Sequence, residues 1–310
     1  MGKATREAYG QALAKIGKEN TNIIVLDADL SKSTKTDVFK QEFPERFFNV
    51  GIAEQNLISV GAGLAAAGKV PFVSSFAMFA TGRAFEQIRN AVCYPKLNVK
   101  ICATHAGITV GEDGATHQSL EDIACMRVLP NMTVVVPADG KETESVIRWA
   151  ATYEGPVYVR LGRAGVDDTT PDDYQFVPGK SQQLIDGTMA TIIACGALVG
   201  PAMEASRQLA NKNISVRVIN MASIKPIDKE AIIRAARETG AIVTAEEHNR
   251  IGGLGAAVAE VVVTEAPVPM QFVGVQDTFG ESGTPKELMA KYGLTAEHIV
   301  AAVEAVIAKK

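Results

Sequence analysis

The chain has 310 residues, a formal net charge of −4 at pH 7 and only 6% aromatic residues. Its mildly acidic balance, with no basic stripe, argues against a nucleic-acid-binding protein, and no apolar run approaches the roughly 18 residues that a membrane span needs. The N-terminus has no apolar signal segment, and the four cysteines form no CxxC pair, so we expect a reducing, cytoplasmic location.

The first block of predicted elements alternates helices with short apolar strands. Helices are expected over 5–19, from about 53 to 68, and over 81–94, 119–130 and 141–154. Strands are expected between them over 21–30, 69–76, 97–105, 132–138 and 156–162. This alternation predicts a parallel sheet with helices on both faces.

The pattern breaks over residues 166–187, which are rich in Pro, Asp and Gly and are predicted to form a linker. A second block follows, with strands over 188–196, 214–222, 241–247 and 268–275 and helices between and after them. The sequence therefore predicts two doubly wound α/β domains. Residues 1–165 form the first, and residues 188–310 form a smaller second one.

Ligands of open α/β sheets bind at the carboxyl ends of the strands. In the first block this rule selects four loops, over 27–34, 76–82, 104–117 and 160–163. We expect these loops to form the functional edge of the domain.

Glu54 begins an apolar helix in the segment NVGIAEQN. It is either an acid that complements the helix dipole or a buried carboxyl whose pKa is raised by desolvation, able to hold or share a proton. Phe76 and Phe79 lie three residues apart where a strand gives way to a helix. They are either core residues or a stacking wall for a flat heteroaromatic ligand.

The Gly-rich segment THAGITVGEDGATHQ carries His105, Asp113 and His117. Their spacing matches no common zinc pattern and no cysteine is placed to help, so hydrogen bonding to a polyhydroxylated substrate fits better. Arginines such as Arg6 and Arg163 are weak signals singly, although an arginine after a strand end can clamp a phosphate. The run GGLGAA over 252–257 lacks the spacing of a dinucleotide-binding motif, and close helix–strand packing explains it equally well.

These segments together resemble the transketolase family. The match is to the C-terminal half of a full-length transketolase, namely its pyrimidine-binding and C-terminal domains. The resemblance covers essentially the whole chain. Its most specific part is the block THAGITVGEDGATHQSLEDIACMRVLPNMTVVVPADGKET, and NVGIAEQN, LDADLSKS and VRLGR align in order and spacing.

The resemblance implies thiamine diphosphate as cofactor and transfer of a two-carbon ketol unit between sugar phosphates. Glu54 would hydrogen-bond the aminopyrimidine ring of the cofactor. The residues expected to lie against the cofactor are Asp29, Leu30, Phe76 and Phe79. Those expected to bind the ketose donor and its phosphate are Arg6, Ser33, His105, Asp113, His117 and Arg163, with Asp113 and His117 at the reacting hydroxyls.

Two departures from the family pattern matter. The chain contains no GDG motif, with which the family binds diphosphate and Mg²⁺. We therefore expect no metal ligands here and a partner subunit that carries GDG…N, in an α₂β₂ assembly. A family Tyr is replaced by Gly82, and Arg83 is a candidate to fill its place.

Three other interpretations remain open at this point. Two are thiamine enzymes, a 1-deoxyxylulose-5-phosphate synthase and the β-subunit of a 2-oxo-acid dehydrogenase. The third is a non-catalytic scaffold subunit that has kept the fold.

Overall fold

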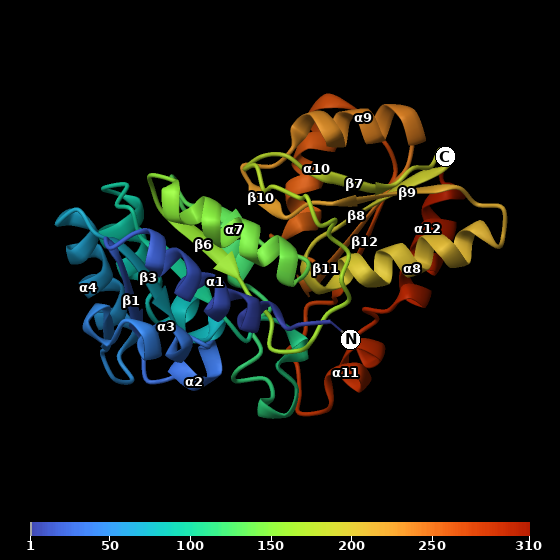
Figure 1. Cartoon of the computed structure of the whole chain (residues 1–310). Helices are drawn as coiled ribbons and strands as arrows, with labels where there is room; N and C mark the ends of the chain where they lie inside the picture. The colour runs from blue at the N-terminus through green and yellow to red at the C-terminus, as the bar shows by residue number, and fades with distance from the viewer. Residues whose placement is uncertain (1) are drawn as a thin grey trace.

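The computed structural model describes residues 2–310 and contains two sheets, with the N-terminal half of the chain at one end of the molecule and the C-terminal half at the other (Figure 1). The first sheet has seven strands, in the spatial order β10 (Ser223–Lys225), β5 (Thr133–Val135), β6 (Val157–Arg160), β4 (Lys100–Ala103), β3 (Val70–Ser74), β1 (Ile23–Asp27) and β2 (Phe47–Asn49). The second has five, in the order β12 (Met270–Val275), β11 (Ile242–Asn249), β8 (Ala190–Ala194), β9 (Val216–Asn220) and β7 (Gln182–Ile185). All pairings are parallel except those of β10 with β5 and β7 with β9, so the predicted fold class is confirmed.

Both faces of each sheet are covered because the strands are apolar on both sides. In β1 all five residues are buried; Ile24 and Leu26 face one core, while Ile23 and Val25 face another. The helices of the first half are α1 (Thr5–Glu19), α2 (Ser31–Thr34), α3 (Asp37–Glu42), α4 (Glu54–Ala66), α5 (Phe85–Gln87), α6 (Asp122–Val128) and α7 (Gly140–Thr152). Those of the second half are α8 (Val199–Ala210), α9 (Lys229–Thr239), α10 (Leu254–Glu265), α11 (Pro285–Lys291) and α12 (Ala296–Ile307).

The two halves share one hydrophobic core. Side chains of α4 and α6, such as Leu57 and Ile123, belong to the same buried cluster as Ile232 of α9 and Val258 of α10. The antiparallel strand β10, from the second half, also completes the edge of the first sheet. The halves are therefore joined by packing and by main-chain pairing.

Several local features differ from the predicted elements, among them the short helices α2 and α3, which lie where no helix was predicted. The last part of the predicted linker forms β7, which pairs antiparallel with β9. The helix expected over 81–94 starts earlier and is wound as π-helix over Phe79–Arg83 (η2) and Ile88–Cys93 (η3), on either side of α5. The strand β10 was not expected, because three residues carry no periodic signal.

No helix of residues 2–310 combines the length and the apolar character that crossing a membrane would take.

Candidate active site

The four predicted loops lie at one edge of the first sheet. They follow β1, β3, β4 and β6, which are neighbours in the order β6-β4-β3-β1. Because these strands are parallel, their carboxyl ends point the same way and bring distant residues together.

Glu54 is the first residue of α4 and is 1% exposed. Its Oε2 accepts a hydrogen bond from Nη1 of Arg83 at 2.7 Å. The guanidinium of Arg83 also lies over the ring of Phe79, with 5.4 Å from Cζ to the centroid. Arg83, next to Gly82, thus links the buried acid to the aromatic residues, while about half of its own side chain is exposed.

Four aromatic rings form a wall beside this acid. Phe76 stacks on Phe79, with centroids 5.9 Å apart and planes 18° apart, and on His105 at 3.8 Å and 21°. His117 meets Phe79 edge-on at 5.2 Å. The stacked phenylalanine rings suit a flat aromatic ligand, and the histidine nitrogens can hydrogen-bond a hydroxylated one.

His105 is buried and has a left-handed backbone, with φ of 55°. Its Nδ1 lies 2.8 Å from Oγ1 of Thr104, and its Nε2 lies 3.2 Å from Nη1 of Arg6. Because a guanidinium only donates, Nε2 accepts and the proton resides on Nδ1. The same nitrogen of Arg6 donates to the carbonyl of Ser33 at 3.0 Å, so Arg6 of α1 joins two predicted residues from two different loops.

We expect His105 to stay neutral throughout the physiological range. Burial, followed by the positive charge of Arg6, lowers the pKa of His105 to about 3. The ring ¹⁵N chemical shifts of His105, assigned by comparison with His105→Gln, should therefore not move between pH 5 and pH 8. A titration midpoint inside that range would contradict the geometry described.

Arg163 and Asp113 lie on the other side of the same site. Arg163 donates to the carbonyl of Val110 and lies 3.2 Å from Glu112 Oε2 and 3.5 Å from Asp113 Oδ2. Burial lowers the pKa of Arg6, and the charge of Arg163 lowers it further. Two guanidinium groups therefore act on one region, as an anion site requires.

The loop after β1 holds the remaining predicted residues. Asp29 has φ of 66°, and its main-chain N–H donates to Asn49 Oδ1 at 3.1 Å. The N–H of Leu30 donates to Oδ1 of Asp27 at 2.5 Å. Burial raises the pKa of Asp27. The role of Asp27 in holding this loop was not predicted from the sequence.

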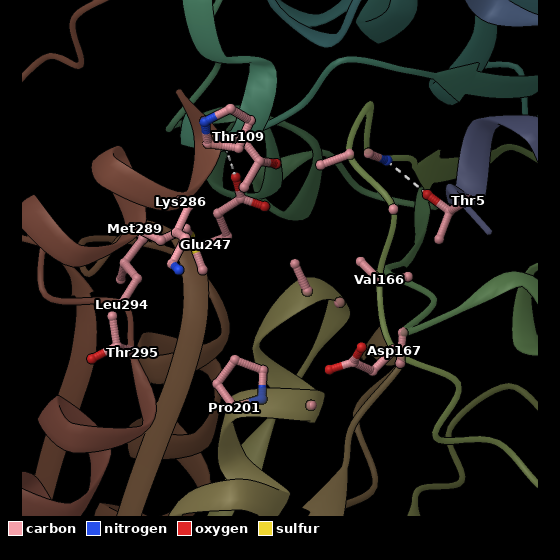
Figure 2. Close-up of a pocket in the computed structure, with 18 of the residues that line it drawn as sticks. Thr5, Thr109, Val166, Asp167, Pro201, Glu247, Lys286, Met289, Leu294 and Thr295 are labelled. Atoms are coloured by element: carbon pink, nitrogen blue, oxygen red, sulfur yellow. Dashed lines mark hydrogen bonds between the residues drawn. The ribbon is translucent and has the colours of Figure 1, made fainter. Parts of the chain in front are cut away.

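Two cavities adjoin these loops. One, of about 530 Å³, lies between Phe79, Arg83 and the exposed Phe279 of the C-terminal half. The other, of about 420 Å³, lies between the two halves and has Thr109 and Glu247 in its wall (Figure 2). Sequence reasoning missed Phe279 and Glu247, because no motif marks them.

The described residues contain no cluster of three or more His, Cys, Asp or Glu side chains that could hold a metal ion.

Comparison with known proteins identifies both halves. Residues 1–167 match the model of the transketolase pyrimidine-binding domain, and residues 179–299 match that of the transketolase C-terminal domain. A putative transketolase C-terminal section from Methanocaldococcus jannaschii is 52% identical over 96% of this chain and 94% of its own length. A 6-deoxy-6-sulfo-D-fructose transketolase subunit from a Clostridium species is 41% identical over 98% of this chain and 95% of its own length.

A solved structure, described as a split-gene transketolase in an inactive β4 tetramer, is 58% identical and superposes with a TM-score of 0.94. The match covers 99% of each chain. The chain belongs to the transketolase family, of which it comprises the pyrimidine-binding and C-terminal domains.

Proposed function

We propose that this chain is the C-terminal subunit of a split, thiamine-diphosphate-dependent transketolase. It transfers a two-carbon ketol unit from a ketose to an aldose when a partner subunit supplies the domain that binds diphosphate and Mg²⁺. The supporting observation is the placement on one sheet edge of a buried acid, an aromatic wall and two arginines. The pyrimidine-binding domain implies use of thiamine diphosphate.

The residues present fit the pyrimidine end of that cofactor. Glu54 is a buried carboxyl at a helix start, and Phe76 and Phe79 offer stacked rings beside it. Thiamine diphosphate, when bound, supplies the electron sink for cleaving a carbon–carbon bond next to a ketose carbonyl. Glu54 would hold the pyrimidine ring by a hydrogen bond in a low-dielectric pocket, and Asp29 and Leu30 would lie close to the cofactor.

The sugar is bound by residues of the loop 104–117 and by the nearby arginines. His117 and Asp113 hydrogen-bond the hydroxyls near the reacting carbons, and His105 continues this surface toward the arginines. Arg6, Ser33 and Arg163 bind the anionic end. Arg6 Nε is buried and has no hydrogen-bond partner among residues 2–310, so it can donate to an incoming ligand.

The partner is inferred from what this chain lacks. It contains no GDG motif, and the relative solved as a β4 tetramer is described as inactive. We propose an α₂β₂ assembly in which each cofactor lies between an N-terminal subunit and this one, with the Mg²⁺ ligands on the N-terminal subunit.

The test is co-expression with a chain that carries GDG…N, followed by a two-substrate assay. The complex, with thiamine diphosphate and Mg²⁺, should convert xylulose 5-phosphate plus ribose 5-phosphate, whereas this chain alone should not. Turnover of pyruvate instead would favour a 1-deoxyxylulose-5-phosphate synthase or a 2-oxo-acid dehydrogenase subunit. A complex without any turnover would favour a scaffold role.

Replacing Arg6 with Ala should raise the KM for a phosphorylated donor about tenfold or more, because a hydrogen bond to a charged group contributes about 1.5–3 kcal/mol. An uncharged ketose donor is the control, and its KM should change little. Steady-state kinetics with xylulose 5-phosphate, a 6-sulfonated ketose and the uncharged ketose would also identify the preferred anion. Equal losses for charged and uncharged donors would contradict an anion-binding role.

A further inference from the structure

Glu247 reaches from the second sheet into the loop that carries the predicted sugar-binding residues. It lies on β11 and is 4% exposed, and its Oε1 accepts a hydrogen bond from the main-chain N–H of Thr109 at 2.6 Å (Figure 2). Gly107 packs directly against the same carboxylate, since a Cβ there would lie 2.3 Å from Oε1. The two parts are 138 residues apart in sequence, so this contact joins the halves of the chain.

The neighbouring carboxylate points elsewhere. Successive residues of a strand face opposite sides, and Glu246 accepts from the N–H groups of Leu254 and Gly255 at 2.7 and 2.8 Å. Glu246 therefore caps α10, whereas Glu247 faces the loop. The two buried acids are thus adjacent on one strand, but one accepts hydrogen bonds from a helix and the other from a loop.

The end of β11 is itself fixed against the first half. Nη2 of Arg160 donates to the carbonyl of Glu247 at 2.8 Å, and the N–H of Asn249 donates to the carbonyl of Leu120 at 2.8 Å. With its backbone held at both points, Glu247 has a defined position from which to hold Thr109.

Gln118, at the other end of the loop, also holds it in place through hydrogen bonds. Nε2 of Gln118 lies within hydrogen-bonding distance of three carbonyls, those of Ile108 and Gly111 at 3.2 Å and that of Glu281 at 2.9 Å, which share its two N–H donors. The short helical segment between these contacts, η4 (Ile108–Asp113), ends at Asp113. Its place relative to the sheet edge is thus set from both halves, by Gln118 of the N-terminal half and by Glu247 and Glu281 of the C-terminal half.

We propose that Glu247 is a positioning residue, which fixes segment 107–113 so that Asp113 and the adjoining histidines meet the ketose donor. This inference rests on the proposed function for its substrate, and it assigns the C-terminal half a role in substrate binding beyond assembly. A carboxylate acceptor on a buried N–H suits the task, because an N–H left without a partner in that place is costly.

The first test is amide hydrogen exchange on the chain alone, which needs no cofactor, partner or substrate. Glu247→Ala should exchange faster over residues 107–113, including Thr109, by about tenfold or more. Glu247→Gln keeps an acceptor oxygen and should restore most of the protection. Glu246→Gln is the matched control, with the same strand and burial, and should leave segment 107–113 as protected as in the wild type.

The second test is steady-state kinetics in the reconstituted complex, with thermal unfolding to exclude a misfolded variant. Glu247→Ala should raise the KM for the ketose donor about tenfold while the apparent affinity for thiamine diphosphate stays within twofold. Glu247→Gln should recover the donor KM, and Glu246→Gln should not change it.

The outcomes separate the two hypotheses. Unchanged exchange over 107–113 in Glu247→Ala overturns the positioning role whatever the activity, as does faster exchange with an unchanged donor KM. A wild-type complex without ketol transfer contradicts the proposed function, and in that case the exchange result still decides whether Glu247 holds the loop.

Discussion

Glu54→Ala, in the complex reconstituted with the partner subunit, should lower kcat by about 10²- to 10⁴-fold, the range that a positioned proton-transfer group contributes. Glu54 is 1% exposed, so bulk water has little access to its carboxyl group. The donor KM should change far less, because the predicted sugar-binding residues lie on other loops. Initial-rate kinetics at saturating thiamine diphosphate would measure both constants.

Two variants make this test specific. Glu54→Gln keeps the size of the side chain but cannot ionise, so it should lose most of the activity as well. Glu144→Ala on α7 removes an exposed acid that pairs with Lys15, and should leave kcat unchanged. If Glu54→Ala assembles with the partner and retains activity within twofold of the wild type, Glu54 has no catalytic role.

Asp122→Ala should lower the free energy of unfolding by about 3–5 kcal/mol, the cost of leaving a buried charge without its partner. Asp122 is fully buried and accepts hydrogen bonds from Nε of Arg160 at 2.8 Å and from the hydroxyl of Tyr158 at 2.7 Å. Urea unfolding at pH 7, monitored by circular dichroism, would measure the loss. Glu230→Ala, which breaks the exposed pair with Lys180, is the control and should change little.

The contribution of Asp122 should also depend on pH. Burial acts to raise the pKa of Asp122, but the charge of Arg160 and the hydrogen bonds outweigh it, so the pKa lies below its usual value. A carboxyl whose pKa is lower in the folded state stabilises the protein above its unfolded pKa of about 3.9, and this stabilisation is lost as the pH falls through the folded pKa. The difference between wild type and Asp122→Ala should therefore be full at pH 6 and shrink below pH 4. A constant difference down to pH 3 would show that the ion pair is not its source.

Much of the fold could be predicted because both sheets are buried on two sides. Strands such as β1 and β8 are then buried at every position and largely apolar, and the helices between them have a different period. The rule that ligands lie at the carboxyl ends of strands selected four loops, and the structure brings them together at one edge of the first sheet. Ser33 and His105 come from two of these loops, whereas Arg6, which contacts both, lies on α1 and is not selected by that rule.

What could not be predicted depends on long-range pairing. Arg83 and Glu54 are 29 residues apart, and Glu247 and Thr109 are 138 apart, so no local pattern links them. The strand β7 lies in a segment whose Pro and Gly residues predict a loop, and it forms because β9 offers an open edge. For the two side-chain contacts and for the strand, a segment distant in sequence decides the structure, rather than the local sequence.

The antiparallel strand β10 has a consequence for how the molecule can be divided. Ser223 and Lys225 pair with Val135 and Val134 of β5, which would otherwise be an exposed edge strand. A polypeptide that ended before residue 223 would leave β5 as an unpaired edge strand. Such an edge can pair with a strand of another molecule, so we expect this polypeptide to aggregate even if its helices form. The N-terminal half should therefore be unsuitable for study on its own, because a strand of the C-terminal half completes its sheet.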